Sequence, residues 1–261
     1  MLISSTSNPR LNMARALKSA QERYVQGLFL AEGVRILEEV IQANLKVKQL
    51  FYIPEDIKSG RERKLLEELL KVTEEEYTVN ERCLKVLAET EQPQGLIATV
   101  EIPDHPLPWS EKSQIIIADR LQDPGNMGSL IRLSAAFACQ AICLLPGCVD
   151  PWNAKVLRGA MGASFRLPIL RLSEDNLITK LKQYSIPLMV AMPIAEMNVW
   201  DVNWRNGWAL AIGNEGAGVS EKLLGQDGLQ FTIPMPGATE SLNAAHAAAI
   251  ALYEASKQRF F

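Results

Sequence analysis

The chain has 261 residues, of which 48% are hydrophobic and 22% are charged, and its formal net charge is −3. This length suits one large or two modest domains, and the composition is typical of a globular protein and excludes an intrinsically disordered one. A net negative charge argues against a protein that coats nucleic acid without discrimination, although it is compatible with a local basic surface.

No segment of the sequence predicts export or membrane insertion. The first residues lack a basic stretch followed by an apolar core, which argues against a secretory signal. The longest nearly apolar run, residues 244–253, is far shorter than the roughly 20 residues that span a bilayer. Four cysteines without a C-x-x-C pair and two histidines predict neither a disulfide framework nor a metal site. We therefore expect a cytoplasmic protein with reduced thiols packed in or near its core.

The first predicted element is a helix over residues 10–21, which Asn8 and Pro9 start. Leu11, Ala14 and Leu17 share one stripe of this helix and are expected to be buried. Charged side chains occupy the remaining surface of the helix.

The N-terminal end is also the basic end of the chain. Residues 1–50 carry seven Lys or Arg and four Asp or Glu, a surplus of three positive charges. Several cations on one surface supply the sequence-independent part of nucleic-acid affinity. The candidate RNA contacts are Arg10, Arg15, Lys18 and Arg35. For the cations on the first helix, an ordinary solvated face is an equally good interpretation.

Short strands and helices alternate over the next part of the chain. Strands are predicted over residues 27–31, 47–53, 77–79 and 94–102, with helices after residues 32, 60 and 80. This alternation predicts a small α/β domain over residues 1–102. The segment 103–113 contains three prolines and no periodic pattern, which predicts a linker to a second domain over residues 114–261.

The second domain begins with an isoleucine-rich run, residues 114–119, which is typical of a strand buried on both faces of a parallel sheet. A D-P-G-N turn then leads into a helix whose residues Met127 to Ser134 include a core-facing stripe. Arg132 lies on the opposite stripe, after Gly128 and Ser129, whose small side chains leave the guanidinium open to a bulky partner. An ordinary surface arginine is the alternative interpretation.

Further strands are predicted over residues 141–145, 166–170 and 188–191, with a helix over residues 177–184. Trp200, Trp204 and Trp208 follow at a spacing of four. They are interpretable as a platform on which RNA bases stack. Packing inside the protein or against a partner subunit is the favoured interpretation, because Asp, Asn and Arg residues lie between them.

Two polar loops follow apolar strands near the C-terminus. One strand ends at Gly213 and is followed by Asn214 and Glu215, while a second strand, residues 231–235, precedes a long alanine-rich helix. Residues Glu240, Ser241 and Asn243 lie where this helix is expected to begin. In open α/β sheets, the loops after the strands bind the ligands. Each loop taken alone is also interpretable as an ordinary turn or helix cap.

Three motifs in the second domain resemble the SpoU/TrmH class of the SPOUT RNA methyltransferases. They are D-P-G-N-M-G-S-L-I-R at residues 123–132, G-N-E-G-A-G at residues 213–218 and I-P-M-P-G-A-T-E-S-L-N at residues 233–243. The earlier pieces F-L-A-E-G-V-R and E-T-E-Q-P-Q-G-L-I-A are more loosely similar to the substrate-binding domain that precedes the catalytic domain in many members of this class.

The resemblance implies a C-terminal methyltransferase domain with a trefoil-knotted parallel sheet, which works as a homodimer, and an N-terminal α/β domain that binds RNA. It implies transfer of a methyl group from S-adenosyl-L-methionine to a ribose 2′-hydroxyl of RNA. Ribosomal RNA is favoured as substrate, because a separate N-terminal domain tends to accompany ribosomal targets in this class. A tRNA methyltransferase and a non-catalytic RNA-binding or ribosome-assembly protein on the same fold are the alternatives.

The resemblance also implies roles for individual residues. The implied catalytic residues are Asn126, Arg132, Glu215, Ser241 and Asn243, and the implied cofactor-binding residues are Gly213, Asn214, Gly218, Ile233, Met235 and Leu242. Asn126, Ser241 and Asn243 are expected to hold helix starts and to contact ribose or phosphate. An arginine with a pKa of about 12.5 or higher is an expensive base, so we expect Arg132 to pair with an RNA phosphate and to stabilise the developing alkoxide.

Overall fold

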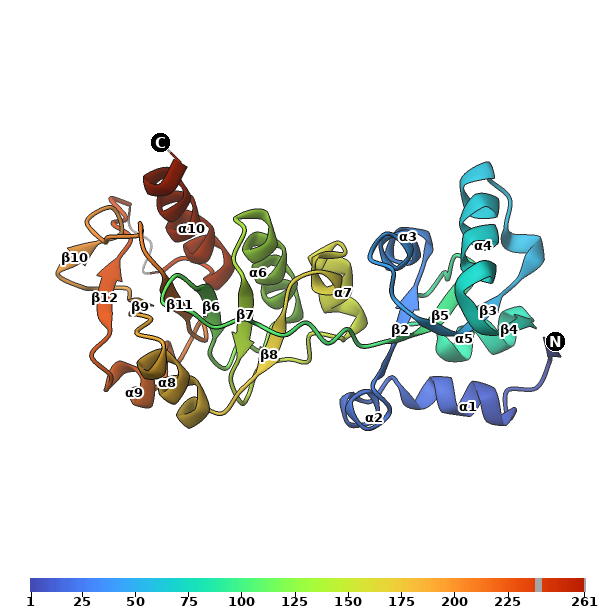
Figure 1. The fold of residues 1–261 in the computed structure, drawn as a ribbon. Coiled ribbons are helices and arrows are strands. Elements are labelled where there is room, and N and C mark those ends of the chain that lie inside the picture. The colour runs from blue at the N-terminus through green and yellow to red at the C-terminus, as the bar shows by residue number, and fades with distance from the viewer. Residues whose placement is uncertain (238–240, 261) are drawn as a thin grey trace. The chain divides into compact units, whose positions relative to one another are not determined.

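The computed structural model describes residues 1–237 and 241–260 (Figure 1). The chain forms two compact units, Met1–Asp104 with Trp152–Phe165, and His105–Pro151 with Arg166–Phe261. The segment Trp152–Phe165, which we expected in the second domain, packs with the first unit, where rings of this segment stack on Phe29. Glu240, expected near the start of the last helix, lies outside the described residues.

The first unit is built on a five-stranded mixed sheet. Its strands are β1 (Leu2–Ile3), β2 (Leu28–Glu32), β3 (Val47–Tyr52), β4 (Thr73–Val79) and β5 (Leu96–Glu101), in the order β1-β4-β3-β5-β2. Its helices are α1 (Pro9–Ala16), α2 (Ala20–Gln26), α3 (Val34–Gln42), α4 (Gly60–Val72), α5 (Glu81–Leu87) and α7 (Ala154–Ala160). Strand β5 runs antiparallel to both of its neighbours, β2 and β3. This is the small α/β unit that the alternating pattern predicted.

The helix expected over residues 10–21 is broken into α1 and α2. The predicted stripe of Leu11, Ala14 and Leu17 is fully buried, but α1 ends at Ala16. The buried side chain of Arg23 donates from Nη1 to the carbonyl of Leu17 at 2.6 Å, which satisfies a main-chain acceptor at the break. A contact of this kind is invisible to a periodicity argument.

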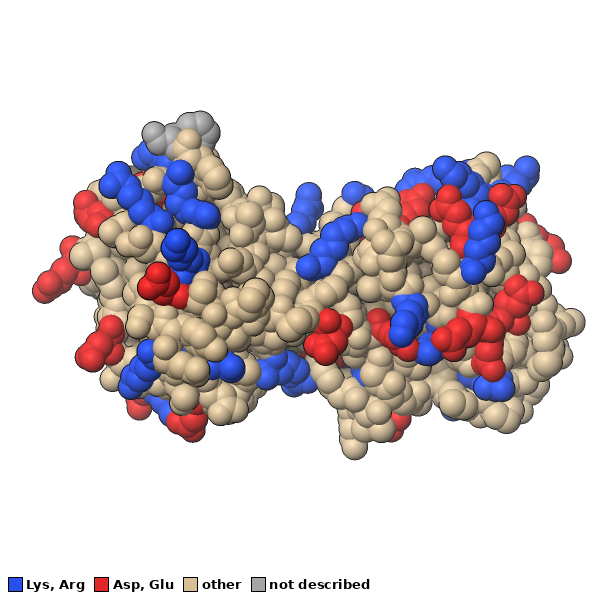
Figure 2. Space-filling model, viewed as in Figure 1, with Lys and Arg blue, Asp and Glu red and all other residues tan. Residues whose placement is uncertain are grey.

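Strand β4 begins at Thr73, four residues before the predicted start. Its first half is rich in glutamate, which disfavours a strand by propensity. Cross-strand pairs offset this cost, because Lys48 on β3 lies 2.7 Å from Glu74, and Gln49 donates to Glu75 at 3.0 Å. Cations and anions are likewise interspersed over the visible surface of this unit (Figure 2).

The second unit contains a seven-stranded sheet in which all strands are parallel, as predicted. The strands are β6 (Gln114–Ala118), β7 (Ala141–Leu144), β8 (Ile169–Arg171), β9 (Leu188–Ala191), β10 (Met197–Asn198), β11 (Trp208–Ile212) and β12 (Leu229–Thr232), in the order β10-β12-β9-β11-β6-β7-β8. The helices are α6 (Pro124–Ala136), α8 (Glu174–Gln183), α9 (Glu221–Leu224) and α10 (Ala244–Phe260). Two strands, β8 and β12, are displaced by two or three residues from their predicted starts.

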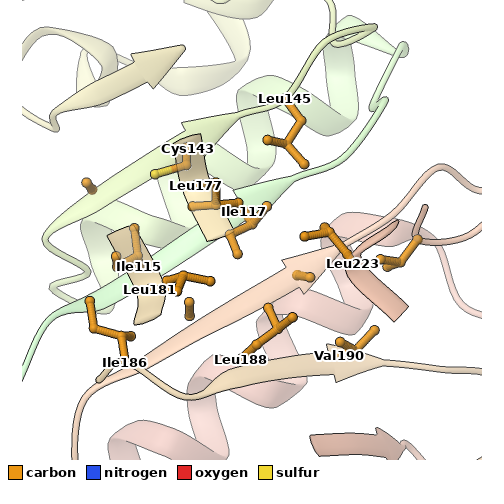
Figure 3. Packing of buried hydrophobic residues seen from close by; sticks show 14 of the residues in the cluster. Ile115, Ile117, Cys143, Leu145, Leu177, Leu181, Ile186, Leu188, Val190 and Leu223 are labelled. Carbon is orange, nitrogen blue, oxygen red and sulfur yellow. The ribbon is translucent and has the colours of Figure 1, made fainter. Parts of the chain in front are cut away.

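One hydrophobic cluster of this unit lies between the sheet and helix α8. Figure 3 shows Ile115 and Ile117 of β6 packed with Leu177 and Leu181 of α8 and with the neighbouring strands. Cys143 belongs to the same cluster. All four cysteines are free thiols, and burial raises the pKa of Cys139 and of Cys143 to about 12. These two thiols therefore stay protonated at neutral pH, in accord with their predicted place in the core.

Residues 102–113, all of which the structure describes, form no helix or strand. The segment is nonetheless attached to the second unit. Leu107 is buried in its core, and the ring of Trp109 stacks on Tyr184 with centroids 6.1 Å apart. The Nζ atom of Lys180 lies 5.1 Å from the centre of the Trp109 ring. The proline-rich segment is thus anchored at one end by apolar and cation–π contacts.

Two of the three regularly spaced tryptophans pack inside the second unit. Trp204 and Trp208 are fully buried and meet edge to face with centroids 5.5 Å apart. Trp204 also donates from its indole to the carbonyl of Val199 at 2.9 Å. The packing interpretation is therefore confirmed for this pair, while Trp200 is exposed. Within residues 1–237 and 241–260, no helix is long and apolar enough to cross a membrane.

Candidate functional site

One cavity of about 240 Å³ lies where the polar loops of the second unit meet. It is lined by the end of β9, the loop after β11, the chain after β12 and the first turn of α10. All six predicted cofactor-binding residues line it, namely Gly213, Asn214, Gly218, Ile233, Met235 and Leu242. In the sequence these residues belong to two separate segments, and in the structure both segments line the same cavity.

The loop after β11 closes on itself. The amide of Asn214 donates to the carbonyl of Gly218 at 3.1 Å, and the amide of Gly218 donates back at 2.8 Å. The side-chain oxygen of Asn214 accepts from the amides of Gly216 and Ala217. A Cβ atom on Gly213 would collide with the backbone of Gly218, so a larger residue there would force the loop open. Gly213 is thus needed for a close main-chain approach, whereas Gly218 allows the loop its positive φ of +66°.

Three of the predicted catalytic residues form one hydrogen-bonded chain. Asn243 donates from Nδ2 to Oδ1 of Asn126 at 2.8 Å, and Asn126 donates from Nδ2 to Oε1 of Glu215. Each residue comes from a different motif, and Glu215 also lines the cavity. The three motifs, up to 117 positions apart, therefore meet at one site.

Of the two helix starts at this site, that of α10 is held by Asn243 as expected, and that of α6 is not held by Asn126. Helix α6 is capped by Asp123, whose carboxylate accepts from the amide of Asn126 at 2.8 Å. The side chain of Asn126 is therefore free to join Asn243 and Glu215. Asn243 itself caps α10 by accepting from the amide of Ala245 at 2.9 Å, whereas Ser241 precedes the helix and lines the cavity.

A model of the SpoU rRNA Methylase family matches residues 113–253, which is more than half of the chain. The chain belongs to the SpoU rRNA methylase family. Residues 8–98 match the model of the MRM3-like substrate binding domain. The family and the parallel-sheet α/β fold predicted from the motifs are thereby confirmed.

Three relatives of this SpoU methylase match it over nearly their whole length. The 23S rRNA (guanosine(2553)-2'-O)-methyltransferase RlmP of Bacillus subtilis is 31% identical, over 96% of this chain and 97% of its own. A crystal structure described as an RNA 2'-O ribose methyltransferase is 34% identical with a TM-score of 0.83, and both chains are covered completely. The SpoU methyltransferase AviRb from Streptomyces viridochromogenes, in complex with AdoMet (S-adenosyl-L-methionine), is 29% identical with a TM-score of 0.85, over 96% of this chain and 98% of its own.

The cavity of this SpoU methylase fits that cofactor. Apolar side chains such as Leu224, Ile233 and Met235 offer a wall for a flat, weakly polar ring, while the closely packed loops offer main-chain groups. Glu215 adds a carboxylate at the rim, which favours a ligand with a positive sulfur. No group of three or more His, Cys, Asp or Glu residues suited to a metal occurs among the residues described.

Arg132 of this SpoU methylase is exposed on α6, opposite the buried stripe that includes Leu130 and Ile131. Within the described parts of the chain, its guanidinium has no hydrogen bond or ion pair. Its five N–H donors are therefore available to a ligand.

The four cations predicted to bind RNA are not equivalent in the structure. Arg10 lies 3.1 Å from the carboxylate of Glu75, and Lys18 donates to the carbonyl of Ala88 at 2.7 Å. Arg15 and Arg35 are exposed. The first two already have partners within the unit, so an RNA phosphate would compete with these contacts.

Sequence reasoning missed several residues at the site of this SpoU methylase. Met192 and Pro193 line the cavity because β9 is the neighbour of β11, and Ala247 does so from the second turn of α10. Asp119 and Arg120, at the end of β6, bond to the loop after β11. The sequence contained a signal for this pair, since two charged residues directly follow the apolar run of residues 115–118, but the order of the strands could not be read from it.

Proposed function

We propose that this SpoU methylase transfers the methyl group of S-adenosyl-L-methionine to the 2′-hydroxyl of a ribose in ribosomal RNA. The class of enzyme and the cofactor follow from the family, while the ribosomal target and the residue roles are our proposal. The observation that carries it is that the three motifs meet beside one cavity, where Asn126 and Asn243 form a hydrogen-bonded chain with Glu215, which lines the cavity.

The role proposed for each residue follows from its position at the site. When bound, the cofactor supplies an activated methyl group on a positively charged sulfur. The loop after β11 and the segment after β12 would hold the cofactor, and Glu215, one oxygen of which accepts from Asn126, would offer its carboxylate to the positive charge. Asn243 orients Asn126 and caps α10, so it sets the spacing between motifs. Correct placement of reacting atoms is a large part of the catalysis such a site offers.

Arg132 and Ser241 are proposed to contact the RNA. The unpaired guanidinium of Arg132 clamps a phosphate and stabilises the ribose oxygen as it becomes anionic, while the proton leaves to water or to a phosphate oxygen. Ser241 is exposed and lines the cavity, so its hydroxyl is placed to bond ribose or phosphate.

Ribosomal RNA is the proposed target for two reasons. The N-terminal unit matches the MRM3-like substrate binding domain, and relatives of similar length carry the names of 23S rRNA methyltransferases. The exposed Arg15 and Arg35 support a surface on this unit that contacts the RNA backbone. We also propose a cytoplasmic location.

A homodimer is the proposed assembly of the enzyme. Helix α10 buries its alanine stripe against its own unit, yet Ile250 and Tyr253 are 40% and 64% exposed on the other side. His246 is exposed on the same side, one turn before Ile250. Large apolar side chains on a regular helix suit a contact with another chain.

The test is to incubate the protein with labelled S-adenosyl-L-methionine and either ribosomal or transfer RNA. We expect label in ribosomal RNA, recovered after digestion as a 2′-O-methylated nucleoside. Label on a base, or in transfer RNA alone, would contradict the proposal. Cofactor binding in calorimetry without transfer to either RNA would favour the non-catalytic alternative.

A further inference from the structure

Two consecutive residues at the end of β6 hold the cofactor loop from outside the cavity. Strands β6 and β11 are parallel neighbours with Ala118 opposite Ile212, so both end at the same edge of the sheet. The amide of Asp119 continues this ladder by donating to the carbonyl of Ile212 at 2.9 Å. Asp119 and Arg120 therefore stand directly beside the loop that begins at Gly213.

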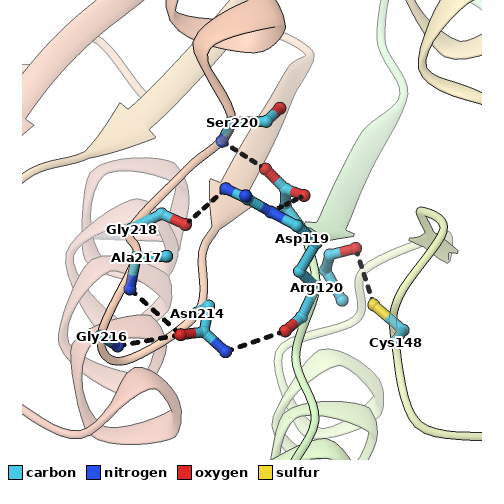
Figure 4. A network of polar contacts seen from close by, with 9 residues as sticks. Asp119, Arg120, Cys148, Asn214, Gly216, Ala217, Gly218 and Ser220 are labelled. Carbon is cyan, nitrogen blue, oxygen red and sulfur yellow. Dashed lines mark hydrogen bonds and ion pairs between the residues drawn. The ribbon is translucent and has the colours of Figure 1, made fainter.

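The pair is bonded to this loop at three points (Figure 4). The fully buried carboxylate of Asp119 accepts from the amide of Ser220 at 2.6 Å. The guanidinium of Arg120 donates from Nη2 to the carbonyl of Gly218 at 3.3 Å. Asn214 donates from Nδ2 to the carbonyl of Arg120 at 3.1 Å. Because Arg120 also donates from Nε to Asp119 at 3.3 Å, one side chain orients the other.

The backbone of Arg120 shows that this arrangement is imposed by its surroundings. Its φ is +56°, a left-handed conformation that L residues with long side chains rarely adopt. Gly147 packs closely against the side chain of Arg120. A Cβ atom on Gly147 would lie 3.2 Å from Cγ of Arg120. Such conformations persist where several contacts determine them together, often at ligand-binding sites.

We propose that Asp119 and Arg120 are positioning residues that hold the loop of residues 214–220 in its binding conformation before S-adenosyl-L-methionine arrives. Neither residue lines the cavity, whereas six residues from Asn214 to Val219 do. A loop with glycines at positions 216 and 218 loses much conformational freedom when it is ordered. Ordering it in advance removes this cost from the binding step. The inference rests on the proposed place of the cofactor.

An ordinary surface ion pair does not account for the arrangement. An ion pair between adjacent residues joins no separate elements, and exposed pairs of this kind contribute little to stability. Three other bonds connect different parts of the chain: Asp119 accepts from Ser220, the carbonyl of Arg120 accepts from Asn214, and the guanidinium of Arg120 donates to Gly218. These contacts all end on the cofactor loop.

The test compares Arg120→Gln and Arg120→Lys with the matched control Arg205→Gln. Gln and Lys tolerate a positive φ no better than Arg, so the variants differ from the unaltered protein in the side-chain donors. Arg205 is exposed and precedes the amino end of β11, at the opposite edge of the sheet. The dissociation constant of S-adenosyl-L-methionine is measured by calorimetry without RNA, and kcat at saturating cofactor with RNA.

We expect Arg120→Gln to weaken cofactor binding by roughly tenfold or more, because it loses donors that a charged group holds in place. The cofactor affinity of Arg120→Lys should lie between those of the unaltered protein and of Arg120→Gln, because Lys keeps the charge but lacks the planar set of N–H donors. The kcat at saturating cofactor should stay within about threefold of the unaltered value, since neither residue touches the reacting atoms. Arg205→Gln should leave both quantities unchanged.

Cofactor affinity in Arg120→Gln equal to that of the control would overturn the inference, as would a fall in kcat with intact affinity. Amide hydrogen exchange of the unaltered, cofactor-free protein adds a test that needs no variant. The Ser220 amide should exchange at least about tenfold more slowly than the Glu215 amide, and equal rates would contradict a preformed loop. Methylation of transfer RNA alone would refute the proposed target, and the affinity data would then decide this inference. A complete lack of cofactor binding would refute both the proposed function and this inference.

Discussion

Single residues decide which chemistry this site supports, and Arg132 illustrates how. It belongs to α6, whose other face packs in the core, so the helix holds the Cα of Arg132 in place while the guanidinium stays free. Gly128 and Ser129, on the preceding turn, put no bulky side chain beside it. A fixed cation with unsatisfied donors suits the recognition of an anion better than the removal of a proton.

Replacement of Arg132 by Lys tests this role. We expect kcat to fall by about tenfold or more, because Lys keeps the charge but cannot bond a phosphate through two parallel N–H groups. The dissociation constant of the cofactor, measured without RNA, should not change. The matched control is Arg205→Lys, which should behave as the unaltered enzyme does. Nearly full activity in Arg132→Lys would rule out a bidentate contact between Arg132 and a phosphate.

At the scale of elements, the first residues of α10 contribute both to the stability of the helix and to the arrangement of the site. The side chain of Asn243 caps this helix with its oxygen and bonds Asn126 with its nitrogen. One short side chain therefore fixes the helix start and the chain of polar groups that ends at Glu215. The cap of α5 by Asn80, which accepts from the amide of Cys83 at 2.9 Å, has no such second contact at the site.

A comparison of Asn243→Ala with Asn80→Ala separates the two effects. Each change should cost about 1 kcal/mol through the lost cap, which for units of this size corresponds to a fall in Tm of about 2–4 °C. Only Asn243→Ala should also reduce methyl transfer, because only Asn243 orients Asn126. Thermal melting and the transfer assay check both expectations. Equal activity in the two variants would mean that the hydrogen-bonded chain is not needed.

At the scale of the whole molecule, the proposed dimer depends on one face of α10. The outer face of α10 carries Ile250 and Tyr253 in exposed positions. If this face meets a second copy of the chain, a charge placed on it must lose its water on association.

We therefore expect Tyr253→Glu to shift the protein from dimer to monomer in analytical ultracentrifugation. Val25→Glu provides the control, because Val25 is 74% exposed on α2 of the first unit. The control should sediment as the unaltered protein does. A protein that is monomeric before any substitution would contradict the proposed dimer directly.

Much of the fold was predictable because it depends on local pattern. The isoleucine run predicted β6, the stripe on α6 is buried as expected, and Asn8 caps the helix that it was expected to start. Predictions failed where a distant contact outweighed local preference. Arg23 bonds the carbonyl of Leu17 at the break after α1, and cross-strand ion pairs keep the glutamate-rich start of β4 in the sheet.

The sequence by itself determined the family, through three specific motifs, and the parallel sheet, through its apolar strand runs, and it named six of the residues that line the cavity. Tertiary structure alone decided that Asn126, Glu215 and Asn243 touch, that β9 contributes to the cavity, and that Asp119 and Arg120 hold the cofactor loop. The physical reason is strand order. A sequence shows where a strand ends, but which other strand ends beside it is settled by the packing of the whole sheet.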